Sequence, residues 1–130
     1  MKKISLLTKI IFHIINIGTI ILYLYPGSIL GWLFYNDFHK QPQLSANFII
    51  SSNHFYAFTI LSMLGLISFR DKKLTYLFIY LFSISIFLEF FHMIIPNRDF
   101  EYSDLFGNLA GSLVVIVLDY FIRNYAKFKN

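Results

Sequence analysis

Hydrophobic and polar positions fall into long blocks along this chain, without the two-residue alternation of a half-buried strand. Four apolar runs, separated by polar segments, cover residues 10–25, 54–69, 74–95 and 105–122. A membrane-spanning helix needs about 20 mainly apolar residues, so the third run is long enough and the first two are near the lower limit. The pattern predicts an all-α integral membrane protein with four transmembrane helices in one bundle.

The polar segments between these runs predict where the chain leaves the membrane. Pro26 and Gly27 end the first run, because proline cannot continue a helix. Residues 28–35 are aromatic but too short to cross, so we expect them to lie at the interface or to fold back into the bundle. Residues 26–53 and 96–104 then form the external loops of a single domain, residues 1–130.

The basic residues predict the orientation of the helices. Lysine and arginine are enriched in the cytoplasmic loops of membrane proteins. Nine of the eleven basic residues fall on one side of the membrane in this arrangement, and Lys40 and Arg98 fall on the other. With alternating spans, both termini of this multi-pass cell-membrane protein are therefore expected in the cytoplasm. The nine residues on that side are Lys2, Lys3, Lys9, Arg70, Lys72, Lys73, Arg123, Lys127 and Lys129.

Composition supports the membrane assignment and excludes other classes. Hydrophobic residues make up 57% of the 130 positions and aromatic residues 20%, more apolar surface than a soluble domain of this length can bury. The formal charge of +4 comes from residues that separate the apolar runs and form no basic face, so a nucleic-acid partner is not expected. Without cysteine, disulfides, Cys-ligated metals and thiol catalysis are excluded.

Glu89 is the candidate around which a functional site is predicted. It lies inside the third apolar run, where an ionisable side chain costs a few kcal/mol and therefore usually has a function. His92 follows three residues later, on the same helix face. The outer ends of the neighbouring helices carry His54, Asp104 and Asn108, and Arg98 lies between them. We expect these polar groups to meet at one depth and to form an outward-opening site.

Structural explanations of the same residues stay open. Glu89 would be neutralised in a buried pair with Arg98 or a histidine. Ser103 or Asp104 would cap the fourth helix. Gly107 and Gly111 form a GxxxG pair, which is typical of close helix packing in membranes.

The spacing of these residues resembles the signature of the VanZ-like membrane proteins. The matching positions, between residues 54 and about 120, are His54, Phe55, Glu89, His92, Pro96, Arg98, Asp104, Asn108 and Gly111. The chain departs from the family's usual pattern at Asn97, where glycine is common, and at His92, where glutamine is common. The resemblance implies a cell-envelope protein and, since the family is associated with resistance to teicoplanin, an effect on glycopeptide susceptibility.

Three functions fit this cluster. The first is binding of an anionic envelope lipid or cell-wall precursor, with Arg98 gripping the anion and Glu89 and Asp104 orienting it. The second is catalysis on a lipid-linked substrate, with Glu89 or His92 as general base. The third is an accessory subunit that docks on a larger membrane protein.

No cofactor is expected from the sequence. The His and carboxylate side chains suffice in number to hold a divalent cation, but no histidine pair has metal-binding spacing, so no metal site is predicted. The expected partners are membrane lipids, a lipid-linked cell-wall precursor or a membrane-protein partner.

Overall fold

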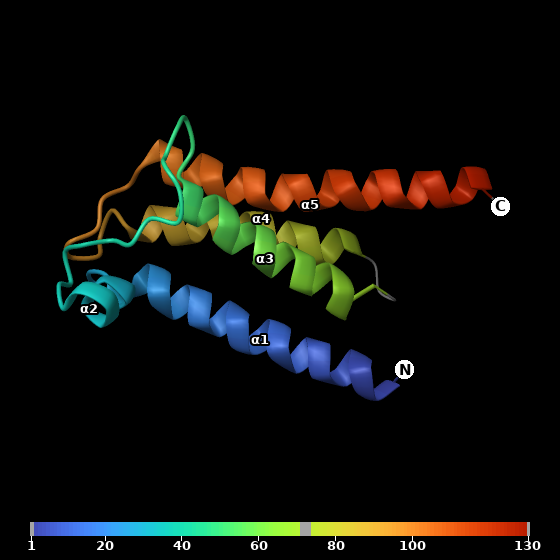
Figure 1. Cartoon of the computed structure of the whole chain (residues 1–130), viewed down its shortest axis with the longest axis horizontal. Coiled ribbons are helices and arrows are strands. Elements are labelled where there is room, and N and C mark those ends of the chain that lie inside the picture. The colour runs from blue at the N-terminus through green and yellow to red at the C-terminus, as the bar shows by residue number, and fades with distance from the viewer. Residues whose placement is uncertain (1, 71–73, 130) are drawn as a thin grey trace.

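The computed structural model describes residues 2–70 and 74–129, and this part of the chain is all-helical (Figure 1). Lys72 and Lys73, which contribute to the predicted orientation, lie outside the described residues. The helices are α1 (Lys2–Leu24), α2 (Ile29–Tyr35), α3 (Ser52–Ser68), α4 (Leu74–Phe91) and α5 (Tyr102–Lys129).

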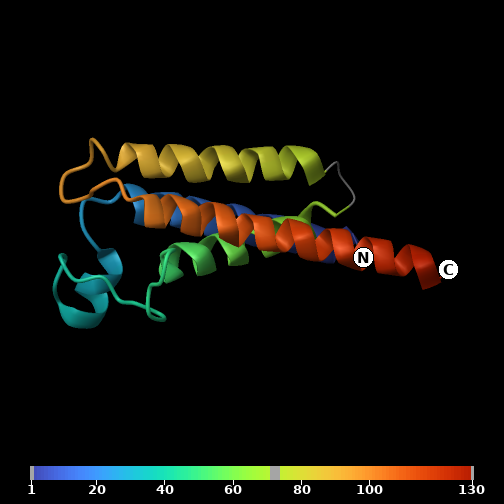
Figure 2. The ribbon, with the colours of Figure 1, turned by 90° about the horizontal axis from the view of Figure 1, so that it is seen from above.

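Four long helices lie side by side, and the central position belongs to α3. It contacts α1, α4 and α5, and its most extensive contact is with α5. The short helix α2 and the loops gather at one end of the bundle, while both termini lie at the other end (Figures 1 and 2). The C-terminal ends of α1 and α4 and the N-terminal ends of α3 and α5 therefore meet at the loop end.

Three of the described helices are long and apolar enough to cross a membrane: Leu6–Leu24, Leu74–Phe91 and Tyr102–Ala126. Large apolar side chains such as Ile14, Phe87 and Phe121 are more than 60% exposed on their outer surfaces. Such a continuous apolar exterior is unfavourable in water and suits a lipid environment. The chain is thus a small helical membrane protein with several candidate spans. Because α3 has only 17 residues, the predicted four-span topology stays a prediction.

Two helix ends differ from their predicted positions. The third apolar run was expected to stay helical to Ile95, but α4 ends at Phe91 and residues 92–95 form a turn. Its bonds run three residues back, from His92 N to Glu89 O at 3.1 Å and from Met93 N to Phe90 O at 3.1 Å. Asn97 then takes a left-handed conformation with φ 60°, which asparagine tolerates. The turn keeps His92 close to Glu89.

The start of α5 corrects the predicted cap. The helix begins at Tyr102, so Ser103 and Asp104 lie within its first turn and neither is the residue before it. Asp104 is nevertheless favourable there, since a negative charge in the first turn complements the partial positive charge of the helix N-terminus. The prediction of a Ser103 or Asp104 cap was therefore wrong in register.

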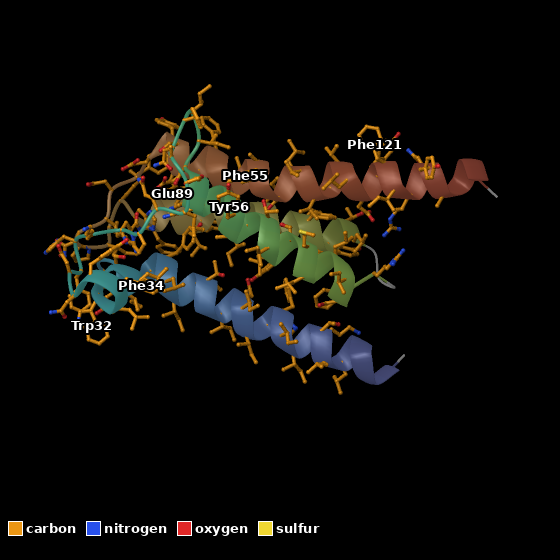
Figure 3. The ribbon with its side chains drawn as sticks, viewed as in Figure 1. Trp32, Phe34, Phe55, Tyr56, Glu89 and Phe121 are labelled. Atoms are coloured by element: carbon orange, nitrogen blue, oxygen red, sulfur yellow. The ribbon has the colours of Figure 1, made fainter. Side chains whose placement is uncertain are left out.

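The short helix α2 lies at the loop end of the bundle, as expected of an interfacial segment. The Ser28 hydroxyl accepts a bond from Gly31 N at 2.9 Å at its start, and Asn36, with φ 54°, ends it. Trp32 and Phe34 remain 48% and 67% exposed (Figure 3). Aromatic side chains on this end are favoured at a membrane interface, so the interfacial alternative fits better than burial in the bundle.

The contact between α3 and α5 is built from small residues. A Cβ at Gly107 would lie 2.7 Å from the carbonyl oxygen of Ser51. At Gly111 it would overlap the carbonyl oxygen of Phe55 and lie 2.9 Å from Thr59 N. Further along, the buried hydroxyls of Ser62 and Ser112 are 3.1 Å apart. Small residues let two helices approach closely where lipid supplies no hydrophobic driving force.

We predict that Gly111→Ala destabilises the protein by about 1–3 kcal/mol, because the added methyl group forces α5 away from the α3 backbone. Gly18→Ala is the matched control, since a Cβ there meets nothing within 4 Å. It should change stability by no more than about 1 kcal/mol. The measurement is the free energy of unfolding in detergent for both variants. Equal values would contradict the close approach of α3 and α5.

Candidate functional site

Glu89 lies on the last turns of α4, at the loop end of the bundle (Figure 3). Its side chain is fully buried. Oε1 accepts a bond from the backbone N–H of Glu101 at 2.9 Å, which ties the loop before α5 to α4. Oε2 is buried and has no hydrogen-bond partner among the described residues. Burying a carboxylate oxygen without a hydrogen-bond partner costs free energy. The packing around Glu89 has to offset this cost.

His92 connects Glu89 with the end of α1. Its Nε2 lies 3.0 Å from the carbonyl oxygen of Tyr23. A carbonyl can only accept, so Nε2 carries the proton of this bond. Nδ1 then faces Glu89 Oε1 at 3.4 Å. An unprotonated Nδ1 and an ionised carboxylate would both be acceptors, so a favourable contact needs one proton between them. The pair is arranged to share that proton.

His54 and Asp104 form a second pair, between α3 and α5. Nε2 of His54 lies 3.4 Å from Oδ2 of Asp104. His54 is buried, and its Nδ1 has no hydrogen-bond partner among the described residues. The Asp104 side chain is 19% exposed and reaches the edge of the site. The close α3–α5 contact brings these two residues together.

Tyr23 lies at the centre of the cluster and was not predicted from the sequence. Its hydroxyl donates to Asn108 Oδ1 at 2.7 Å. Its ring lies 4.8 Å from that of His54 and 6.1 Å from that of His92, between centroids. A tyrosine at the end of an apolar run is typical of the membrane interface. Nothing in the sequence therefore indicated that Tyr23 would be buried.

Arg98 bonds differently from the prediction. Its Nη2 donates to the carbonyl oxygens of Leu22 at 3.0 Å and Gly27 at 2.6 Å, and its Nε to that of Tyr25 at 3.2 Å. Leu22 lies in the last turn of α1, and Tyr25 and Gly27 directly follow the helix, so Arg98 caps its C-terminal end. Neither Glu89 nor Asp104, which were expected to orient Arg98, shares a hydrogen bond or ion pair with it. None of the hydrogen bonds that Arg98 makes to described residues uses Nη1.

The charge of Arg98 is kept despite its partly buried position. Burial lowers the pKa of the guanidinium from its usual value, whereas the nearby carboxylates of Asp104 and Glu89 raise it. Arginine is not deprotonated in proteins, so one permanent positive charge stands at the edge of the acidic cluster. Arg98 compensates that cluster through space, without direct ion pairing.

Two adjoining cavities open beside the cluster. One, of about 290 Å³, is largely apolar and lies between α1, α2 and the start of α3, where its walls include Ala57 and Ile60. The other, of about 190 Å³, is mostly polar and includes Asp99 and Asp104. The residues common to both walls are Ser28, Gln41, His92 and Arg98. An apolar and a polar compartment therefore share one boundary.

A larger apolar groove, of about 610 Å³, lies toward the other end of α1 and α4. The polar groups in it are few, and Asn16 Nδ2 bonds the hydroxyl of Tyr80 at 2.5 Å. Among the described residues that line it there is no carboxylate, and His13 is the one basic side chain. The candidate site is therefore the loop-end cluster.

Comparison with protein-family models, curated proteins and solved structures finds no match for this chain. The fold and the site define a class in physical terms: a small helical membrane protein with a buried polar cluster at one end of its bundle. Five of the six predicted binding residues, His54, Glu89, His92, Asp104 and Asn108, meet in that cluster, while Arg98 lies at its edge.

Removing the Arg98 guanidinium should destabilise the end of α1. We expect Arg98→Ala to cost about 2 kcal/mol or more, since it leaves three carbonyls without their charged donor. Arg98→Lys should lose part of this, because an ammonium cannot reproduce the planar fork. Thermal unfolding in detergent measures the effect.

The matched control for this prediction is Arg123→Ala. Arg123 is half-exposed on α5 and pairs with Asp119 at 2.8 Å, four residues earlier. Exposed pairs of this kind contribute at most about 1 kcal/mol. A loss of stability no larger in Arg98→Ala than in Arg123→Ala would show that Arg98 does not cap α1.

Proposed function

We propose that this chain is a four-span membrane protein of the cell envelope that binds an anionic lipid, such as a lipid-linked cell-wall precursor, at the loop end of its bundle. The observation that carries the proposal is the shared boundary of the two cavities. A lipid with a phosphorylated headgroup likewise consists of an apolar chain joined to a polar group. Its chain would occupy the apolar cavity beside Ala57 and Ile60, and its phosphate the polar cavity beside Arg98.

The charges around the polar cavity support a headgroup with several functional groups. Arg98 supplies a guanidinium for the phosphate, through the Nη1 end that caps no carbonyl. Asp99 and Glu101 on the same walls would accept hydrogen bonds from hydroxyl or amine groups. A cell-wall precursor carries phosphate together with such donors, whereas a simple anionic phospholipid offers fewer of them.

The orientation of the site rests on the basic residues. Lys9 lies in the first half of α1, Arg70 follows the end of α3, and Arg123 lies in the last turns of α5. These parts of the helices lie toward the end of the bundle that holds the termini, opposite the cluster (Figure 1). The positive-inside rule then puts both termini in the cytoplasm and the cluster on the outer side. Envelope precursors are accessible there. The resemblance of residues 54 to about 120 to the VanZ-like proteins supports the same cellular context and, by extension, an effect on glycopeptide susceptibility.

A second candidate function is catalysis on the same lipid, and the Glu89–His92 pair favours it. Oε1 and Nδ1 of this pair are 3.4 Å apart, and His92 lines both cavities, so its imidazole is the member of the pair that a bound substrate would reach. A base of this kind would take a proton from a hydroxyl or water beside the bound phosphate. Glu89→Gln would then retain the lipid and abolish turnover.

Filling the apolar cavity should reduce lipid binding. We predict that Ala57→Trp lowers the fraction of protein carrying a polyprenyl phosphate at least tenfold in native mass spectrometry, because the indole ring occupies the space of the chain. Ala126→Trp is the matched control on an exposed position of α5, and it should bind like the wild type. A neutral polyprenol should be retained less than the phosphate by the wild type.

Two results would contradict the proposed function. Equal retention by Ala57→Trp and Ala126→Trp would separate the lipid from the apolar cavity. Absence of any bound lipid, with a larger protein complex in its place, would favour an accessory subunit of a membrane assembly.

A further inference from the structure

Three potential metal ligands from three different helices meet in the cluster. His54 on α3, Glu89 on α4 and Asp104 on α5 each offer one ligand atom, and these atoms lie within 4.8 Å of one another. The residues are 15 or more positions apart in the sequence, so no local spacing reveals the group. The number of histidines and carboxylates was visible in the sequence, but only the helix packing brings these three side chains together.

Independent observations point to a missing positive partner. Glu89 Oε2 is buried without a hydrogen-bond partner among the described residues. The Glu89 side chain itself is fully buried. Arg98 carries a positive charge at the edge of the cluster, but its hydrogen bonds go to carbonyl oxygens at the end of α1. Glu89 and Asp104 then face histidines at 3.4 Å, and no permanently charged side chain of the described residues bonds to either carboxylate. A bound cation would remove the cost of burying them.

We propose that His54, Glu89 and Asp104 bind one divalent cation of the Zn²⁺ or Mn²⁺ class. One imidazole nitrogen with two carboxylate oxygens is a donor set that suits these ions better than Mg²⁺ or Ca²⁺, which prefer oxygen alone. The proposal does not depend on lipid binding.

The distances are compatible with this assignment. His54 Nε2 and Asp104 Oδ2 are 3.4 Å apart. Two ligands on tetrahedral zinc, with bonds of about 2.0–2.1 Å, are separated by about 3.3 Å. The other separations in the group, which are at most 4.8 Å, have to shorten by up to about 1.5 Å to reach this tetrahedral value.

The site has an entry path and an open coordination position. Asp104 lines the polar cavity and is partly exposed, so an ion can reach it from that side. Three protein ligands leave a fourth position for water or for an anionic oxygen, as in catalytic rather than structural zinc sites. An anion in the polar cavity would therefore lie next to the cation.

Direct metal titration tests the proposal. The full chain, purified in detergent and stripped with a chelator, is titrated with Mn²⁺ while electron paramagnetic resonance reports the free ion, and Zn²⁺ is then added as competitor. We expect one Mn²⁺ per chain, displaced by Zn²⁺. His54→Ala and Asp104→Asn should weaken binding at least about tenfold, since each removes one of three ligands.

Matched controls keep the test independent of folding. His13→Ala removes an exposed histidine outside the cluster, and Asp119→Asn alters a carboxylate that pairs with Arg123, so both should bind Mn²⁺ like the wild type. Zn²⁺ should raise the unfolding temperature of the wild type and both controls, but not of Asp104→Asn. No stoichiometric Mn²⁺ or Zn²⁺ binding by the wild type, or equal affinity in Asp104→Asn and Asp119→Asn, would overturn the site. Failure of lipid binding would leave it intact.

Discussion

The close approach of the α3 and α5 backbones is the contact on which the loop-end site depends. Gly107 and Gly111 leave no room for a side chain against Ser51, Phe55 and Thr59. This contact sets the register between the two helices, because a shift along either axis would replace glycine by a larger residue. His54 and Asp104 lie within one turn of it, on α3 and α5 respectively. The packing of two helices thus determines which charged groups meet.

Large apolar side chains cover the exterior of the bundle, and in its interior polar groups lie beside an apolar core. The buried polar groups include several serines, two histidines, Asn108 and Glu89, and the buried apolar ones include Phe58, Leu61 and Leu81. Hydrogen bonds satisfy many of these groups, as in the pair of Ser62 and Ser112. Four buried side-chain atoms of the described residues have no partner, and three of them, on His54, Glu89 and Asn108, belong to the same cluster. Stability alone gives no reason for concentrating this cost at one place.

The helices were predictable from the sequence because apolar runs and helix breakers are local signals. The run containing Glu89 gave α4, and the GxxxG pair at Gly107 and Gly111 indicated a close contact. The common depth of His54, Glu89 and Asp104 followed from counting residues to the ends of the runs. That count predicted the depth that these three residues share, but not that Tyr23 joins them.

The details that sequence reasoning missed all depend on contacts between distant segments. Arg98 turned out to bond the carbonyl ends of α1, more than 70 residues away, and no spacing rule predicts such a partner. Tyr23 joins the cluster for the same reason, through a bond to Asn108 across 85 positions. The early end of α4 comes from the turn that keeps His92 beside Glu89.

The most direct measurement of this arrangement uses the absence of native cysteine. In Ser62→Cys/Ser112→Cys, the two sulfurs replace hydroxyl oxygens that are 3.1 Å apart between α3 and α5. We predict rapid formation of an intramolecular disulfide in the membrane under mild oxidation. Ser62→Cys/Leu113→Cys is the control, because Leu113 is exposed on another side of α5 and should remain uncoupled. Cross-linking of the control but not of the first pair would contradict the register that brings His54 and Asp104 together.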